Sequence, residues 1–136
     1  MAKYTEIEGK CRKIVDDARN GVFAPVYLLM GGEPYYPDMV CDAIMKYALQ
    51  DDERDFNQAV YYGLDTDADA VASEARSYPM MAERRLVVLK EAQSMKTLEG
   101  LGVYAAEPMD TTVLVILMHG ASADKRKALY KNVSKK

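Results

Sequence analysis

The sequence predicts an α/β fold in three layers, α/β/α, with helices on both faces of a mostly parallel sheet. Four short apolar runs alternate with stretches whose apolar residues recur at helical spacing. This alternation is typical of parallel strands joined by right-handed helical crossovers. The length of 136 residues suits one domain with its own hydrophobic core.

The first elements are predicted from the apolar spacing and from the residues that end each run. Apolar residues recur every three or four positions along Tyr4–Asn20, and Gly21 favours a helix end there. Val26–Met30 is apolar throughout, as is typical of a central parallel strand. A second helical stripe covers Met39–Ala48, and the charged stretch Asp51–Asp55 ends it.

The middle of the chain predicts two strands and the helix between them. Phe56–Tyr62 has the aromatic and β-branched composition of a strand. Thr66, followed by Asp69, resembles a capping box that starts a helix over about Asp67–Arg76. Leu86–Leu89 is a short apolar run and is predicted to be the third strand.

The last elements are a helix over Leu98–Ala105, stopped by Pro108, and a fourth strand over Thr112–Met118. Ser122 is expected to cap a final helix that reaches Val133. Because no strand follows that helix, we expect residues 1–136 to be the first domain of a longer chain.

Composition disfavours several classes of function. The formal net charge of −3 is unlike the basic excess of dedicated nucleic-acid binders. No apolar run approaches the roughly 20 residues of a membrane span, and the polar N-terminus lacks a signal-peptide core, so we expect a cytoplasmic protein without a membrane partner. With Cys11, Cys41 and the single His119, no zinc cluster of the usual spacings can be assembled, and no metal or cofactor is expected.

The segment after the first predicted strand begins like a phosphate-binding P-loop and then departs from it. Against the pattern G-x-x-x-x-G-K-[ST] from Gly31, the second glycine falls on Tyr36, the lysine on Pro37 and the hydroxyl on Asp38. Proline lacks an N–H group for a phosphate, and the acids would repel a polyanion. The residues of this degenerate nucleotide loop are Gly31, Gly32, Glu33, Tyr36, Pro37 and Asp38.

An alternative hypothesis keeps a nucleotide at this end of the sheet. It is an NTP-binding enzyme or switch with an unorthodox phosphate site built on Gly31, Gly32 and Lys90. Lys90 follows the third strand, at the position where a P-loop enzyme usually has an acid that holds magnesium. The positive charge of Lys90 would compete with the metal ion there. A melting-temperature shift with magnesium and ATP would support this hypothesis.

The connection from Ser77 to Glu83 is unusually apolar for a loop. It contains Tyr78, Pro79, Met80 and Met81, and the proline prevents the preceding helix from continuing. Two interpretations are open. The loop could fold back and cover one end of the core, or it could offer its methionines to a pocket on a partner protein.

Four stretches in this order and spacing resemble a known family: PVYLLMGGEPYYPD, DFNQAVYYG, SYPMMAERRLVVLKEAQ and DKRKALYK. Together they resemble the N-terminal domain of the delta subunit of bacterial DNA polymerase III, particularly the form found in Bacteroidetes-like bacteria. The likeness covers nearly the whole chain, and its most specific element is the first stretch.

This resemblance implies an AAA+-like fold that does not bind ATP, in a non-catalytic clamp-loader subunit of the DNA polymerase III holoenzyme that helps to open the β sliding clamp for loading on DNA. The family grips the clamp with a short helix and a loop before the third strand, which end in two large apolar residues. Other loader subunits would join mainly through a lid and a collar domain that follow this one, and DNA would be met indirectly within the loader. The matching clamp-binding residues are Arg76, Ser77, Tyr78, Pro79, Met80 and Met81.

Overall fold

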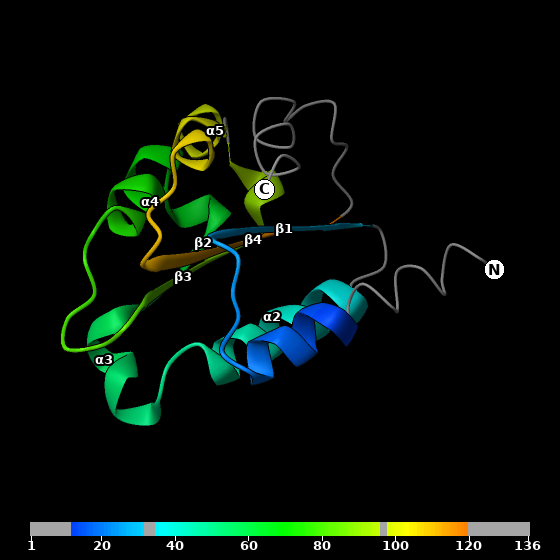
Figure 1. The fold of residues 1–136 in the computed structure, drawn as a ribbon. Coiled ribbons are helices and arrows are strands. Elements are labelled where there is room, and N and C mark those ends of the chain that lie inside the picture. Colours follow the sequence, from blue (N-terminus) through cyan, green and yellow to red (C-terminus); the bar gives the residue numbers. More distant parts are fainter. Residues whose placement is uncertain (1–11, 32–34, 96–97, 120–136) are drawn as a thin grey trace.

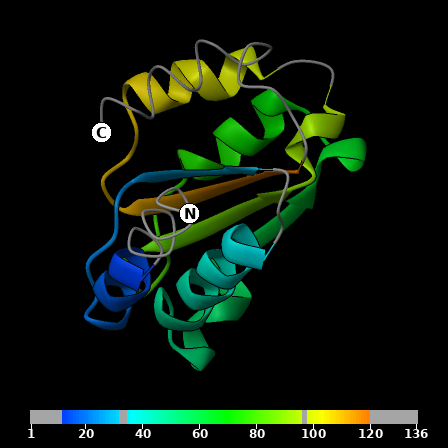
Figure 2. The ribbon, with the colours of Figure 1, turned by 90° about the vertical axis from the view of Figure 1, so that its right-hand side faces the viewer.

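Four strands form one parallel sheet with the order β1-β4-β3-β2 in the computed structural model, which describes residues 12–31, 35–95 and 98–119. All three pairings are parallel, and Figure 2 shows the strands side by side. The parallel α/β fold predicted from the sequence is therefore confirmed. The strands are β1 (Val26–Gly31), β2 (Gln58–Tyr62), β3 (Arg85–Lys90) and β4 (Thr112–His119).

Helices cover both faces of this sheet. The helix of residues 12–19 and α2 (Tyr35–Tyr47) lie on one face, whereas α4 (Ala68–Ala75) and α5 (Glu99–Ala106) lie on the other (Figure 1). The single turn α3 (Arg54–Asn57) comes directly before β2. The predicted final helix from Ser122 and residues 4–11 of the first helix lie outside the described residues.

The core has two halves, because successive side chains of a strand point to opposite faces of the sheet. In β3, Val87 and Leu89 pack with the cluster under α4 and α5, and Leu86 and Val88 pack with the cluster under α2. All four are fully buried. A buried aliphatic side chain contributes roughly 1.5–3 kcal/mol, so the central strands β3 and β4 hold the three layers together.

The predicted strand Phe56–Tyr62 starts two residues too early. Phe56 and Asn57 belong to α3, which follows a 3-10 turn at Asp51–Glu53. The physical reason is Arg54, whose Nη2 donates to the carbonyls of Met45, Lys46 and Leu49 at distances of 3.1, 2.9 and 3.2 Å. It thereby satisfies orphan carbonyls where α2 ends and folds this segment back on that helix.

Helix α4 is confirmed, but its predicted capping residue is wrong by one position. The N-cap is Asp67, not Thr66, and its carboxylate accepts a hydrogen bond of 2.8 Å from the backbone N–H of Ala70. An aspartate here accepts from the orphan amides of the first turn and also suits the positive end of the helix dipole. The apolar residues Val71, Ala72 and Ala75 of this helix are buried.

Gly63, just after β2, lies too close to the end of β3 to carry a side chain. A Cβ at this position would lie 2.1 Å from the carbonyl oxygen of Glu91, which itself has a left-handed φ of 58°. We expect Gly63→Ala to lower the free energy of unfolding by about 1–3 kcal/mol, because backbone must shift to relieve the overlap. Denaturant unfolding would measure the loss.

A matched control is Gly100→Ala in α5. There the nearest atom to a new Cβ is a carboxylate oxygen of Asp69, at 2.8 Å, and this exposed side chain can turn away. Alanine also has the better helix propensity, by roughly 1 kcal/mol. Gly100→Ala should therefore leave stability unchanged or raise it, and an equal loss in both variants would contradict the argument from the Glu91 carbonyl.

Candidate protein-binding site

The loop between α4 and β3 presents its large apolar side chains to solvent. Tyr78 is 76% exposed, Met80 58% and Met81 101%. The interpretation that these side chains cover the core is therefore wrong. Of the other predicted clamp-binding residues, Arg76 is also exposed, while Ser77 and Pro79 are half-buried. The loop precedes β3 and so lies at the amino-terminal edge of the parallel sheet.

A neighbouring exposed aromatic side chain comes from α3. Phe56 is 65% exposed and, with Met80 and Met81, lines a hollow of about 260 Å³. The other lining residues are Asp52, Glu53 and Asn57. Sequence reasoning missed Phe56, because its aromatic ring was read as part of a strand. The acids of residues 51–53 followed by Arg54 are the signal that could have indicated a helical turn here.

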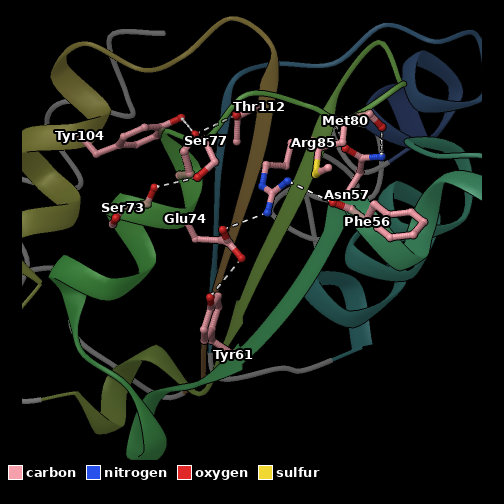
Figure 3. Close-up of polar contacts among 11 residues, drawn as sticks. Phe56, Asn57, Tyr61, Ser73, Glu74, Ser77, Met80, Arg85, Tyr104 and Thr112 are labelled. Carbon is pink, nitrogen blue, oxygen red and sulfur yellow. Dashed lines mark hydrogen bonds and ion pairs between the residues drawn. The ribbon is translucent and has the colours of Figure 1, made fainter.

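Asn57 joins this turn to the loop across 23 residues of sequence. Its side-chain oxygen accepts a hydrogen bond of 2.6 Å from the Met80 N–H, and its side-chain nitrogen donates to the Met80 carbonyl at 2.8 Å (Figure 3). The same nitrogen donates to the Glu53 carbonyl at 3.0 Å. Asn57 is 1% exposed, so these bonds are shielded from water and hold the backbone of Met80 against α3.

Arg85, the first residue of β3, makes a second connection behind the loop. Its guanidinium donates to the Phe56 carbonyl at 3.2 Å and pairs with Glu74 at 2.9 Å (Figure 3). Glu74 also accepts from the Tyr61 hydroxyl at 3.3 Å. Desolvation, followed by the nearby Glu74 carboxylate, raises the pKa of Tyr61. This network ties α4, β2 and α3 together around the base of the loop.

The end of α4 is fixed by contacts to the core of the same domain. The Ala75 carbonyl accepts from the Thr112 hydroxyl at 2.8 Å and from the Tyr104 hydroxyl at 3.4 Å. Ser77 bonds back to the Ser73 carbonyl, and the Arg76 guanidinium lies 5.7 Å from the centre of the Tyr104 ring. Arg76 and Ser77 therefore help to end the helix, and the loop starts from a rigid point.

Met81 has a left-handed backbone, with φ of 55°. Outside glycine this conformation is uncommon, and such residues persist only where their surroundings hold them. Here the preceding residue, Met80, is held by Asn57 on both its N–H and its carbonyl. The backbone turn thus places the Met81 side chain fully in solvent, which is an unfavourable position for an apolar group unless a partner covers it.

The degenerate nucleotide loop lies at the opposite, carboxyl-terminal edge of the sheet. Gly31 ends β1, Gly32 and Glu33 lie outside the described residues, and Tyr36, Pro37 and Asp38 fall in the first turn of α2. Pro37 suits the first turn of a helix, where its missing N–H would have no partner within the helix.

A pocket of about 330 Å³ opens at this edge. Among the residues that the structure describes, the charged side chains lining it are Asp38, Asp42, Glu91 and Lys90. This part of the lining is net acidic, which disfavours a triphosphate. Cys41 also lines the pocket and is buried. Desolvation raises its pKa to about 11, although Lys90 opposes the shift, so this thiol is a poor nucleophile at neutral pH.

No group of three or more histidine, cysteine, aspartate or glutamate side chains within the part of the chain that the structure describes could hold a metal ion. Likewise, none of the helices found there is long and apolar enough to cross a membrane.

Comparison with known proteins assigns the family. The model of the family described as "DNA polymerase III, delta subunit" matches residues 27–136. The chain belongs to the DNA polymerase III delta subunit family. A curated relative, the DNA polymerase III subunit delta of Bacillus subtilis, is 30% identical over 127 residues, which cover 86% of this chain and 37% of the relative.

One solved structure agrees with this assignment to the delta family, and a second shares the fold. The Bacillus subtilis DNA clamp loader delta protein matches with a TM-score of 0.81 and 27% identity, over 92% of this chain and 40% of that chain. A gamma subunit-related protein of DNA polymerase III from Thermotoga maritima matches at 15% identity and a TM-score of 0.54, over 95% and 43% of the two chains, which shows a shared fold. The AAA+-like fold is thus confirmed. The chain spans about two fifths of these relatives, and the likeness to the Bacteroidetes form stays a prediction.

Proposed function

We propose that this chain is the clamp-binding part of a DNA polymerase III clamp loader, and that it binds the β sliding clamp through its apolar loop without catalysing a reaction. The observation that carries the proposal is the full exposure of Met81 beside the exposed Tyr78 and Met80. Family membership supports the choice of partner. The six residues Arg76–Met81 form the proposed clamp-binding element, with the two methionines as anchors.

The proposed mechanism uses binding energy to open a ring. The two methionines enter an apolar pocket on the clamp near its subunit interface, where each buried side chain contributes roughly 1.5–3 kcal/mol. A domain that binds a distorted clamp more tightly than a closed one shifts the population toward the open ring. ATP hydrolysis by neighbouring loader subunits would control access to this face, and DNA would be met through the assembled loader in the cytoplasm.

A titration of the purified β clamp of the same organism against this chain tests the proposal. Saturable binding of one chain per clamp protomer, followed by calorimetry, is the expected result. No binding at micromolar concentrations would contradict it.

Melting curves with and without magnesium and ATP test the nucleotide-binding alternative. The pocket beside Lys90 predicts no change in melting temperature, because the part of its lining that the structure describes is net acidic and disfavours a triphosphate. A clear rise in melting temperature would favour the nucleotide-binding alternative and would count against a purely clamp-binding role.

A further inference from the structure

We propose that the hollow between α3 and the apolar loop receives one apolar side chain of the clamp, and that the clamp carries a lysine or arginine beside that side chain. This inference rests on the proposed clamp binding and makes the contact reciprocal. The Met81 side chain enters a pocket of the clamp. At the same time, an apolar side chain of the clamp enters the hollow that Phe56, Met80 and Met81 line.

The size and the lining of the hollow indicate a side chain as its occupant. Its volume of about 260 Å³ is below the roughly 300–1,000 Å³ typical of small-molecule sites. Asn57 lines it too, but both atoms of its amide already make hydrogen bonds to Met80. The surface left for contact is therefore mainly that of Phe56 and the two methionines, which favours an aliphatic group.

The charge around the hollow indicates what must stand beside that group. Asp52 and Glu53 line it, and the exposed Asp55 lies on the same turn. The nearest cation on this turn, Arg54, pairs with Asp51 and donates to carbonyls at the end of α2, so it does not neutralise the other acids. A partner surface that covers these carboxylates must supply positive charge.

The same charges argue against a second copy of this chain as the occupant. Two copies meeting at this face would bring the exposed Asp52 and Asp55 of both copies together, and the whole chain has a formal net charge of −3. Like charges so placed oppose association, whereas a basic clamp surface would be attracted.

The fixed geometry of the hollow would lower the cost of binding. Asn57 holds the loop to α3, and Arg85 holds the Phe56 carbonyl, so the two walls do not need to be ordered when the partner arrives. Preorganised surfaces of this kind lose less conformational entropy on association.

The test measures binding of the clamp by this chain and its variants. We expect Phe56→Ala to raise the dissociation constant at least tenfold, as is typical of an aromatic residue at the centre of an interface. Phe56→Leu should keep most of the affinity. Removing two rim charges, with Asp52→Asn and Asp55→Asn together, should weaken binding at low ionic strength by roughly two- to fivefold. It should also flatten the dependence of affinity on salt.

Controls at the opposite edge of the sheet are Leu64→Ala, whose side chain is 82% exposed, and Asp65→Asn, which is also exposed. Neither should change the affinity. An unchanged dissociation constant for Phe56→Ala, or an unchanged salt dependence for the rim variant, would overturn the inference. If Met80→Ala with Met81→Ala abolishes binding while Phe56→Ala does not, only this inference fails. If neither affects binding, the proposed clamp contact fails with it.

Discussion

Replacing Met80 and Met81 together with alanine is expected to weaken binding of the β clamp by about a hundredfold or more. The two side chains would bury most of the apolar surface of the contact, at roughly 1.5–3 kcal/mol each, and alanine keeps only the first carbon of each. A tenfold change in affinity corresponds to about 1.4 kcal/mol. Titration of the variant and the parent chain against the same clamp preparation gives the ratio directly.

The same double substitution should leave the fold intact. Met80 and Met81 are 58% and 101% exposed, so the folded state gains little from them, and exposed substitutions usually change the free energy of unfolding by less than about 0.5 kcal/mol. Leu64→Ala is the matched control, since it removes an exposed apolar side chain from the other edge of the sheet. If the variant still bound the clamp and lost much of its stability, the loop would serve to stabilise the fold and not to bind the clamp.

The strands and the sheet could be predicted because their signal is local. A buried parallel strand is an uninterrupted apolar run, and three of the four runs that predicted a strand lie wholly within one: β1, β3 and β4 extend the predicted ranges by one or two residues. The apolar loop was also visible, since Pro79 prevents a helix and leaves two methionines in a connection. The sequence left open whether those methionines are exposed or cover the core, and in the structure both are exposed.

The other half of the candidate site could not be predicted, because it depends on contacts between distant residues. Phe56 lies in the turn α3, which Arg54 attaches to the end of α2 through hydrogen bonds to three carbonyls. Asn57 holds the loop through hydrogen bonds to the backbone of Met80, which is 23 residues away in the sequence. Neither side chain carries a periodic signal, and β propensity alone favoured a strand at Phe56.

Asn57→Ala is expected to lower the free energy of unfolding by about 1–3 kcal/mol. Alanine leaves the N–H and carbonyl of Met80 without the partners that Asn57 provides at 2.6 and 2.8 Å, in a site where Asn57 is 1% exposed. Clamp affinity should fall as well, because the loop would lose its attachment to α3 and would have to be ordered on binding. Denaturant unfolding and clamp titration of the same preparation separate the two effects.

Native-state hydrogen exchange at the Met80 amide tests the mechanism behind that loss. The amide should be protected in the parent chain and exchange much faster in Asn57→Ala, since local opening no longer has to break the bond to the asparagine. Asn57→Asp is the informative comparison. Its carboxylate still accepts from the Met80 N–H but cannot donate to the carbonyls of Met80 and Glu53, so amide protection should survive in part while stability falls. Equal protection in all three chains would mean that the loop is held by something other than this side chain, and the link between Asn57 and clamp affinity would then be lost.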